Sequence, residues 1–130
     1  MVEMALILPV LLLLIIGMLE FARAWNAKQV ITDAAREGAR LAVVQNDDVD
    51  QTDVTAAIAT SLSRSGIPGW AATIQFDEAP FPAGNWRRTG EIQQVYVGVD
   101  YRFSFLGPLI KAATGSETIR MAALVAMRNE

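Results

Sequence analysis

The chain has 130 residues and a formal net charge of −3, with 11 Lys and Arg residues against 14 Asp and Glu residues. It contains neither cysteine nor histidine. Disulfides, thiolate metal sites and the commonest general base are therefore excluded. The acidic balance argues against a nucleic-acid partner. No spacing of carboxylates, or of serine and lysine, indicates a catalytic site, so we expect no enzyme, no metal and no other cofactor.

A run of sixteen residues without a charge, residues 4–19, lies between Glu3 and Glu20. As a helix this run is about 24 Å long, against roughly 30 Å for the hydrocarbon core of a bilayer. Val2, Phe21 and Ala22 can extend it. We interpret the run as a segment that enters a membrane and can also pack against copies of itself. A cleaved signal peptide is the alternative, but no positively charged segment precedes the run.

The helical pattern continues beyond the apolar run. Small and apolar side chains follow at spacings of three and four, which form one stripe on a helix. This stripe consists of Ala24, Ala27, Ile31, Ala34, Gly38 and Leu41. We predict one helix from about Met4 to Val44, about 60 Å long at 1.5 Å per residue. Its apolar half must then protrude from the rest of the chain, which gives a helix over residues 1–44, with an apolar polymerisation or membrane segment at 1–22, and a globular head at 45–130.

A second helix is predicted from about Thr52 to Ser65. Asp50 or Thr52 can cap its start, and Gly66 with Pro68 ends it. Its inner face is formed by Val54, Ala57, Ile58, Ser61 and Leu62. The acidic residues around it, Asp47, Asp48, Asp50 and Asp53, lack the glycine and the distant glutamate of an EF-hand loop. We interpret them as a solvated loop with a helix cap.

The period of the pattern then changes to two, which is typical of strands. Apolar residues alternate over residues 72–76 and again over residues 94–105, and Gly107 and Pro108 end the second strand. Residues 117–128 fit a helix and a strand equally well. The long connection at residues 77–91 is of a length typical of functional loops or interfaces. It carries candidate exposed contact residues that either bind an external ligand or pack on the head or on a neighbouring subunit: Phe81, Trp86, Arg87 and Arg88.

Several motifs together resemble the TadE-like family, the pseudopilins of tight-adherence (Flp-type), type IV-like pili. They are residues 2–6 with Pro9, Gly17 with residues 20–23, residues 34–40 (AAREGAR) and the ending at 126–130. The resemblance favours a strand at residues 117–128. It therefore implies a pilin-like α+β fold, in which a long N-terminal helix packs on a small three-stranded antiparallel sheet with one short extra helix.

The resemblance also implies a function. We expect a structural subunit of an extracellular Tad-type pilus filament, a helical homo-oligomer used for surface attachment and biofilm formation. The expected partners are copies of the chain, the inner membrane before assembly, the pilus assembly machinery and a prepilin peptidase. Two alternatives remain open: a membrane-anchored minor pseudopilin that primes or caps another pilus, and a bitopic anchor that presents a binding domain.

The residues expected to act in assembly lie on the long helix. Glu3 is expected to pair with the α-amino group of a neighbouring subunit, although a carboxylate is also favourable at any helix N-terminus. Pro9 and Gly17 mark a stretch that can kink or unwind. The full set for the core helix is Glu3, Leu6, Pro9, Leu12, Leu13, Ile16, Gly17, Glu20 and Phe21. The set for contacts between subunits or between helix and head is Arg36, Glu37, Gly38 and Arg40.

Overall fold

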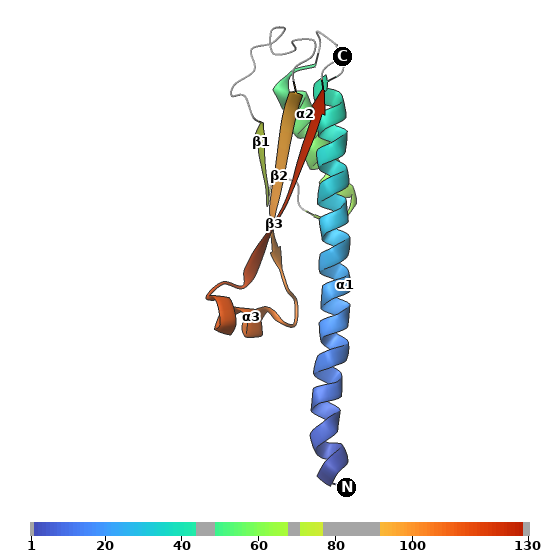
Figure 1. Ribbon diagram of the computed structural model, residues 1–130, viewed down its shortest axis with the longest axis vertical. Coiled ribbons are helices and arrows are strands. Elements are labelled where there is room, and N and C mark those ends of the chain that lie inside the picture. Colours follow the sequence, from blue (N-terminus) through green and yellow to red (C-terminus); the bar gives the residue numbers. More distant parts are fainter. Residues whose placement is uncertain (1, 44–48, 68–70, 77–91, 129–130) are drawn as a thin grey trace. The chain divides into compact units, whose positions relative to one another are not determined.

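The computed structural model describes residues 2–43, 49–67, 71–76 and 92–128 (Figure 1). The elements in chain order are α1 (Val2–Val43), α2 (Gln51–Arg64), β1 (Ala72–Phe76), β2 (Ile92–Arg102), α3 (Gly107–Thr114) and β3 (Thr118–Arg128). The three strands form one sheet in the order β1-β2-β3, and Ile74 of β1 lies opposite Val97 of β2 in an antiparallel pair. The predicted α+β fold, a long helix on a three-stranded antiparallel sheet, is confirmed, and residues 118–128 form a strand.

Two features of the fold differ from the prediction. The second strand was expected to reach Phe105, but β2 ends at Arg102. The chain then turns into α3, a helix that the prediction did not contain. Pro108 occupies the first turn of α3, where its fixed φ and missing N–H are tolerated. Gly115 closes the helix at φ 81°, and its N–H donates to the carbonyl of Lys111 at 2.8 Å. The Gly107-Pro108 pair, which was expected to end the second strand, therefore marks the start of α3.

The described chain divides into two compact units. The first comprises residues 1–27 and 101–119, and the second comprises residues 28–100 and 120–130. In the second unit, residues 28–43 of α1 pack with α2 and the sheet around one apolar core. The buried members of this core are Ile31, Ala34, Ala35, Ala39 and Ala42 of α1, Val54, Ile58 and Leu62 of α2, Val95, Val97 and Val99 of β2, and Ala123 of β3.

The small-residue stripe of α1 lets α2 approach closely. Gly38 is buried, and a Cβ placed on it would lie 2.4 Å from Cδ1 of Ile58. Lys28 of the same helix donates a hydrogen bond from Nζ to the carbonyl of Ala122 in β3. Because β3 is a terminal strand of the sheet, this bond satisfies one of the carbonyls that a terminal strand can leave unpaired.

The second helix starts and ends as its sequence predicts. Asp50 is the N-cap: its carboxylate accepts the backbone N–H of Asp53 at 2.9 Å, and the Asp53 carboxylate accepts the backbone N–H of Asp50 at 3.0 Å. The first of these bonds is the main reason that the pKa of Asp50 lies below its ordinary value. Gly66 follows the helix at φ 80°, and its N–H donates to the carbonyl of Ser63, as in a Schellman ending.

Candidate functional site

The first half of α1 carries a continuous exposed apolar surface within the first unit. Its large hydrophobic side chains are between 45% (Ile15) and 71% (Leu6) exposed. They are Met4, Leu6, Ile7, Leu8, Val10, Leu11, Leu12, Leu13, Leu14, Ile15, Met18, Leu19, Phe21 and Trp25. Among the described residues, α1 is long and apolar enough to cross a membrane, with a mean hydropathy of 2.3 over a window that is 6% buried. This helix is suited to membrane insertion or to burial against other apolar helices.

The residues predicted for the core helix divide by exposure. Glu3, in the first turn of α1, is exposed, as are Leu6, Pro9, Leu12, Leu13 and Phe21, while Ile16 and Gly17 are half-buried. The helix is continuous through Pro9 and Gly17, so the local unwinding expected from these two residues is not found in the described helix. The ring of Phe21 lies 6.2 Å from that of Trp25. Trp25 was not predicted to take part in the site.

Glu20 differs from its neighbours because it is buried, with 1% of its surface exposed. Its carboxylate accepts the backbone N–H of Ser104 at 3.1 Å and lies 3.4 Å from Nη1 of Arg23. A buried carboxylate needs such partners, because its desolvation is costly without them. Glu20 therefore fastens the turn between β2 and α3 to the side of α1.

Two aromatic rings lie at the end of β2 in the same unit, Tyr101 in the strand and Phe103 just after it. Tyr101 and Phe103 meet edge to face, with ring centroids 5.1 Å apart. Burial raises the pKa of the Tyr101 hydroxyl, and the negative charge of Glu20 raises it further. The hydroxyl therefore stays protonated at neutral pH and can still donate a hydrogen bond.

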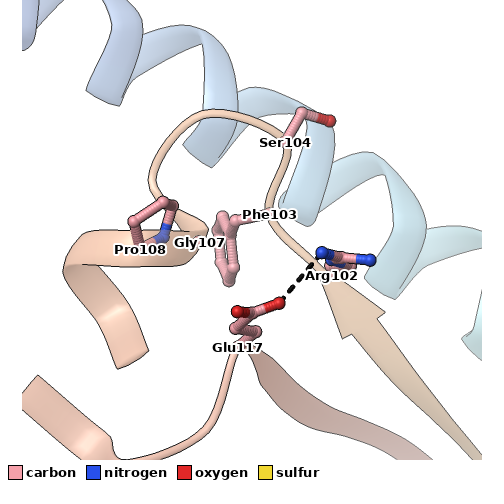
Figure 2. A pocket seen from close by; sticks show the side chains of 6 residues that line it. All are labelled: Arg102, Phe103, Ser104, Gly107, Pro108 and Glu117. Atoms are coloured by element: carbon pink, nitrogen blue, oxygen red, sulfur yellow. Dashed lines mark hydrogen bonds and ion pairs between the residues drawn. The ribbon is translucent and has the colours of Figure 1, made fainter. Parts of the chain in front are cut away.

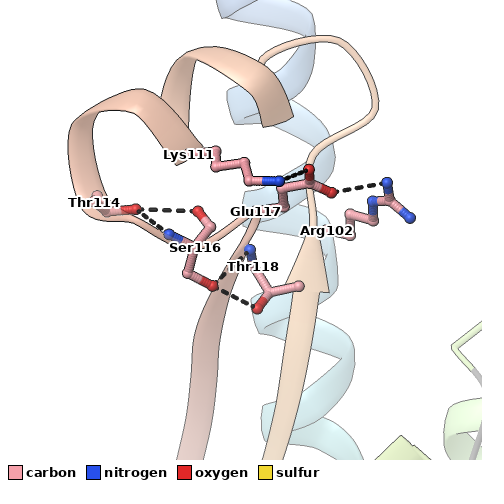
Figure 3. Close-up of polar contacts among 6 residues, drawn as sticks. All are labelled: Arg102, Lys111, Thr114, Ser116, Glu117 and Thr118. Atoms are coloured by element: carbon pink, nitrogen blue, oxygen red, sulfur yellow. Dashed lines mark hydrogen bonds and ion pairs between the residues drawn. The ribbon is translucent and has the colours of Figure 1, made fainter.

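A polar cluster joins the second half of α3 to the two strands that precede and follow this helix, β2 and β3 (Figure 3). Glu117 accepts one hydrogen bond from Lys111 and one from Arg102, each at 2.9 Å. Next to it, Thr114 accepts the N–H of Ser116 at 3.4 Å. The hydrogen bond from Lys111, followed by the attraction of the Lys111 and Arg102 charges, lowers the pKa of Glu117. The cluster was not found from the sequence because its members lie 6 and 15 residues apart and follow no helical or strand period.

The lowered pKa of Glu117 predicts a pH dependence of stability. Because the folded-state pKa lies below the ordinary value of 4.5, the ionised group stabilises the fold above that pH, and this contribution is lost as the pH falls through the folded-state value. We expect Glu117→Gln to lower the unfolding temperature at pH 7, and the difference from the unmodified chain to shrink as the pH falls below 4.5. Thermal unfolding followed by circular dichroism in detergent measures it. A difference that is the same at every pH would contradict this role.

A cavity of about 350 Å³ lies beside the cluster (Figure 2). Arg102, Phe103, Ser104, Gly107, Pro108 and Glu117 line it. Two of these residues, Arg102 and Glu117, form an ion pair at 2.9 Å, so the charges that line the cavity satisfy each other. The described residues contain no group of three or more carboxylates that could hold a metal ion.

The residues predicted to join subunits, or helix and head, lie on the second half of α1. Arg36 is exposed and pairs with Asp33 of the same helix at 3.1 Å, and Glu37 and Arg40 are also exposed. Exposed pairs one helical turn apart contribute little to stability. Gly38 instead faces α2 within the core. Phe81, Trp86, Arg87 and Arg88, together with Asp47 and Asp48, lie outside the described residues.

A family profile described as TadE-like protein matches residues 1–40. The chain is TadE-like over this segment, so the resemblance seen in its motifs is confirmed. No curated protein and no solved structure matches the chain significantly. A TadE-like segment implies a protein associated with Tad pili, and the family is a structural, pilus-related one. The matched segment contains the exposed apolar surface of α1, Glu20 and the stripe of small residues up to Gly38.

Proposed function

We propose that the chain is a structural subunit of an extracellular Tad-type pilus filament, a helical homo-oligomer that serves surface attachment and biofilm formation. The observation that supports this proposal is the exposed apolar surface over residues 4–19 of α1. Burying one such side chain stabilises an assembly by about 1.5–3 kcal/mol before the entropy of association is subtracted. In a filament, residues 1–22 of many copies bury these surfaces against one another and form the core, while the head at residues 45–130 forms the outer shell.

The same surface supports a membrane-inserted stage before assembly. In this proposal the chain waits in the inner membrane, a prepilin peptidase processes it, and the pilus assembly machinery transfers α1 from lipid to the filament core. Both environments are apolar, so the transfer does not expose the surface of α1 to water.

A second candidate is a membrane-anchored minor pseudopilin that primes or caps another pilus, because the exposed surface of α1 suits a single copy in a heteropolymer equally well. Shearing cells and imaging the released material separates the two. Long uniform filaments composed of this chain support the proposed role, and its presence in small amounts relative to another pilin supports the minor one. A chain that stays with the membrane fraction and is absent from all filaments would contradict both.

Glu3 supplies a direct test of assembly. It is exposed in the first turn of α1, where it is free to pair with the α-amino group of a neighbouring copy. Removing one partner of a buried ion pair costs about 3–5 kcal/mol, so we expect Glu3→Gln to reduce the sheared filament severely. The measurement is the filament yield at equal amounts of cellular protein. The control Glu3→Asp retains the charge and should assemble better than Glu3→Gln, and an unchanged yield for Glu3→Gln would exclude the pairing.

A further inference from the structure

A second exposed apolar surface lies on the turn before α3 and on α3 itself. Phe105 is 65% exposed and Leu109 is 59% exposed, and Pro108 between them is exposed as well. Leu106 and Ile110, which directly follow Phe105 and Leu109 in the chain, are half-buried. Removing two large apolar side chains from water is favourable, so an apolar environment that covers Phe105 and Leu109 would stabilise this segment. The neighbouring residues of the first unit indicate which environment that is.

The hydrogen bond from Ser104 to Glu20 sets the position of this surface along the axis of α1. Because the carboxylate of Glu20 is buried in that contact, the exposed surface of α1 carries no charge from Met4 to Ala22. Nineteen helical residues span about 28 Å, close to the roughly 30 Å hydrocarbon core of a bilayer. Glu20 therefore lies near the edge of the hydrocarbon when α1 is inserted, and the turn bound to Glu20 lies at the same edge.

Two other properties of the first unit suit this position. The exposed rings of Phe21 and Trp25 lie on α1 directly after Glu20, and aromatic residues are enriched where a membrane meets water. The unit is balanced in charge, with the cations Arg23, Arg102 and Lys111 against the anions Glu3, Glu20 and Glu117, whereas the whole chain is acidic. Two of its cations, Arg102 and Lys111, are exposed and lie close in sequence to this surface. Apolar side chains with neighbouring cations are the pattern of segments that lie on phospholipid surfaces.

We infer that Phe105 and Leu109 insert into the interfacial layer of the phospholipid bilayer while the chain is membrane-inserted. They form a second membrane contact beside α1, and the bond from Ser104 to Glu20 sets its depth. The inference rests on the proposed membrane stage. It adds that extraction of a subunit into a filament must withdraw this contact as well as α1.

Site-specific labelling tests the inference, because the chain has no native cysteine. Four full-length variants carry a single cysteine with an environment-sensitive fluorophore: Phe105→Cys, Leu109→Cys, Leu12→Cys and Glu37→Cys. Each is reconstituted at low protein density in vesicles of phosphatidylcholine and phosphatidylglycerol, with nitroxide quenchers placed near the headgroup or near the end of the acyl chain. Leu12 reports on insertion of α1. Glu37, exposed on α1 about 22 Å beyond Ala22 at 1.5 Å per residue, is the aqueous control.

We expect the labels at Phe105 and Leu109 to shift to shorter wavelength and to lose more fluorescence to the shallow quencher than to the deep one. The label at Leu12 should respond to the deep quencher and the label at Glu37 to neither. Quenching at Leu12 without quenching at Phe105 and Leu109 overturns the inference but leaves the proposed membrane stage intact. No quenching at Leu12 contradicts the membrane stage itself.

A second copy of the chain is the competing occupant of this surface. If another copy covers Phe105 and Leu109, their labels will shift to shorter wavelength only as protein density in the vesicles rises, and lipid quenchers will not reach them. That result overturns the inference. As an independent arm, the double variant Phe105→Ser and Leu109→Ser should lose shallow quenching of a label at Pro108→Cys, whereas Phe105→Leu with Leu109→Ile should retain it. Equal quenching in both double variants also overturns the inference.

Discussion

Replacing Gly38 by alanine is expected to destabilise the fold, although alanine is the better helix former. The added Cβ would lie 2.4 Å from Cδ1 and 2.5 Å from Cγ1 of Ile58. Ile58 is fully buried, so it cannot move aside without disturbing the core between α1 and α2. Overpacking of this kind costs about 1–3 kcal/mol, against a gain of about 1 kcal/mol in helix propensity. Chemical unfolding in detergent, followed by circular dichroism, measures the difference.

Gly17→Ala is the matched control, because it makes the same substitution in the same helix where nothing lies within 4 Å of the new Cβ. It should be neutral or stabilise by up to about 1 kcal/mol. Ile58→Ala alone should cost about 2–5 kcal/mol through the cavity that it leaves. Because the Cβ added by Gly38→Ala would occupy part of that cavity, the double variant should cost less than the two single variants together. Additive effects, or a Gly38→Ala variant as stable as the unmodified chain, would exclude this close contact.

The position of Gly38 illustrates what a helical period can predict. The predicted stripe was expected to face a partner; Ala24, Ala27, Ile31, Ala34 and Gly38 are buried, and its last member, Leu41, is half-buried. β1 agrees with the alternation of residues 72–76 in the same way. Periodicity succeeds over these segments because one face of residues 24–41 and of β1 is consistently less exposed than the other. For residues 118–128 the two periods fitted equally well, and only the resemblance to TadE-like proteins favoured the strand.

The first unit shows where periodicity fails. Phe103 and Phe105 continue the alternation of β2, yet the chain leaves the sheet after Arg102, because the pattern records polarity and not the hydrogen bonds that a strand needs. The bond between Glu20 and Ser104 joins residues 84 positions apart, and no local pattern contains it. Glu20 was placed in the core helix for assembly, and nothing in the pattern around it indicates that its carboxylate is satisfied within its own chain. The contacts predicted for the loop at residues 77–91 stay predictions, because that loop lies outside the described residues.

The burial of Glu20 also changes how firmly α1 is expected to be held in a membrane. The uncharged run of residues 4–19 is short for a bilayer when Glu20 is counted as a charged end. With the Glu20 carboxylate covered by Ser104 and near Arg23, the uncharged exposed surface extends to Ala22. Position 13 then lies at the centre of the span, and its leucine is exposed.

Leu13→Arg is therefore expected to have the largest effect on insertion. An arginine at the centre of a membrane helix costs about 2.5–3.5 kcal/mol on insertion scales, which corresponds to a change of roughly 70- to 400-fold in the partition between membrane and water. The fraction of the full chain that floats with liposomes in a density gradient measures it. Gln29→Arg adds the same charge at an exposed position of α1 outside the apolar run and should float like the unmodified chain. If both variants float equally, the exposed surface of α1 does not hold the chain in the bilayer, and its apolar side chains must be buried in another way, as in contacts between copies.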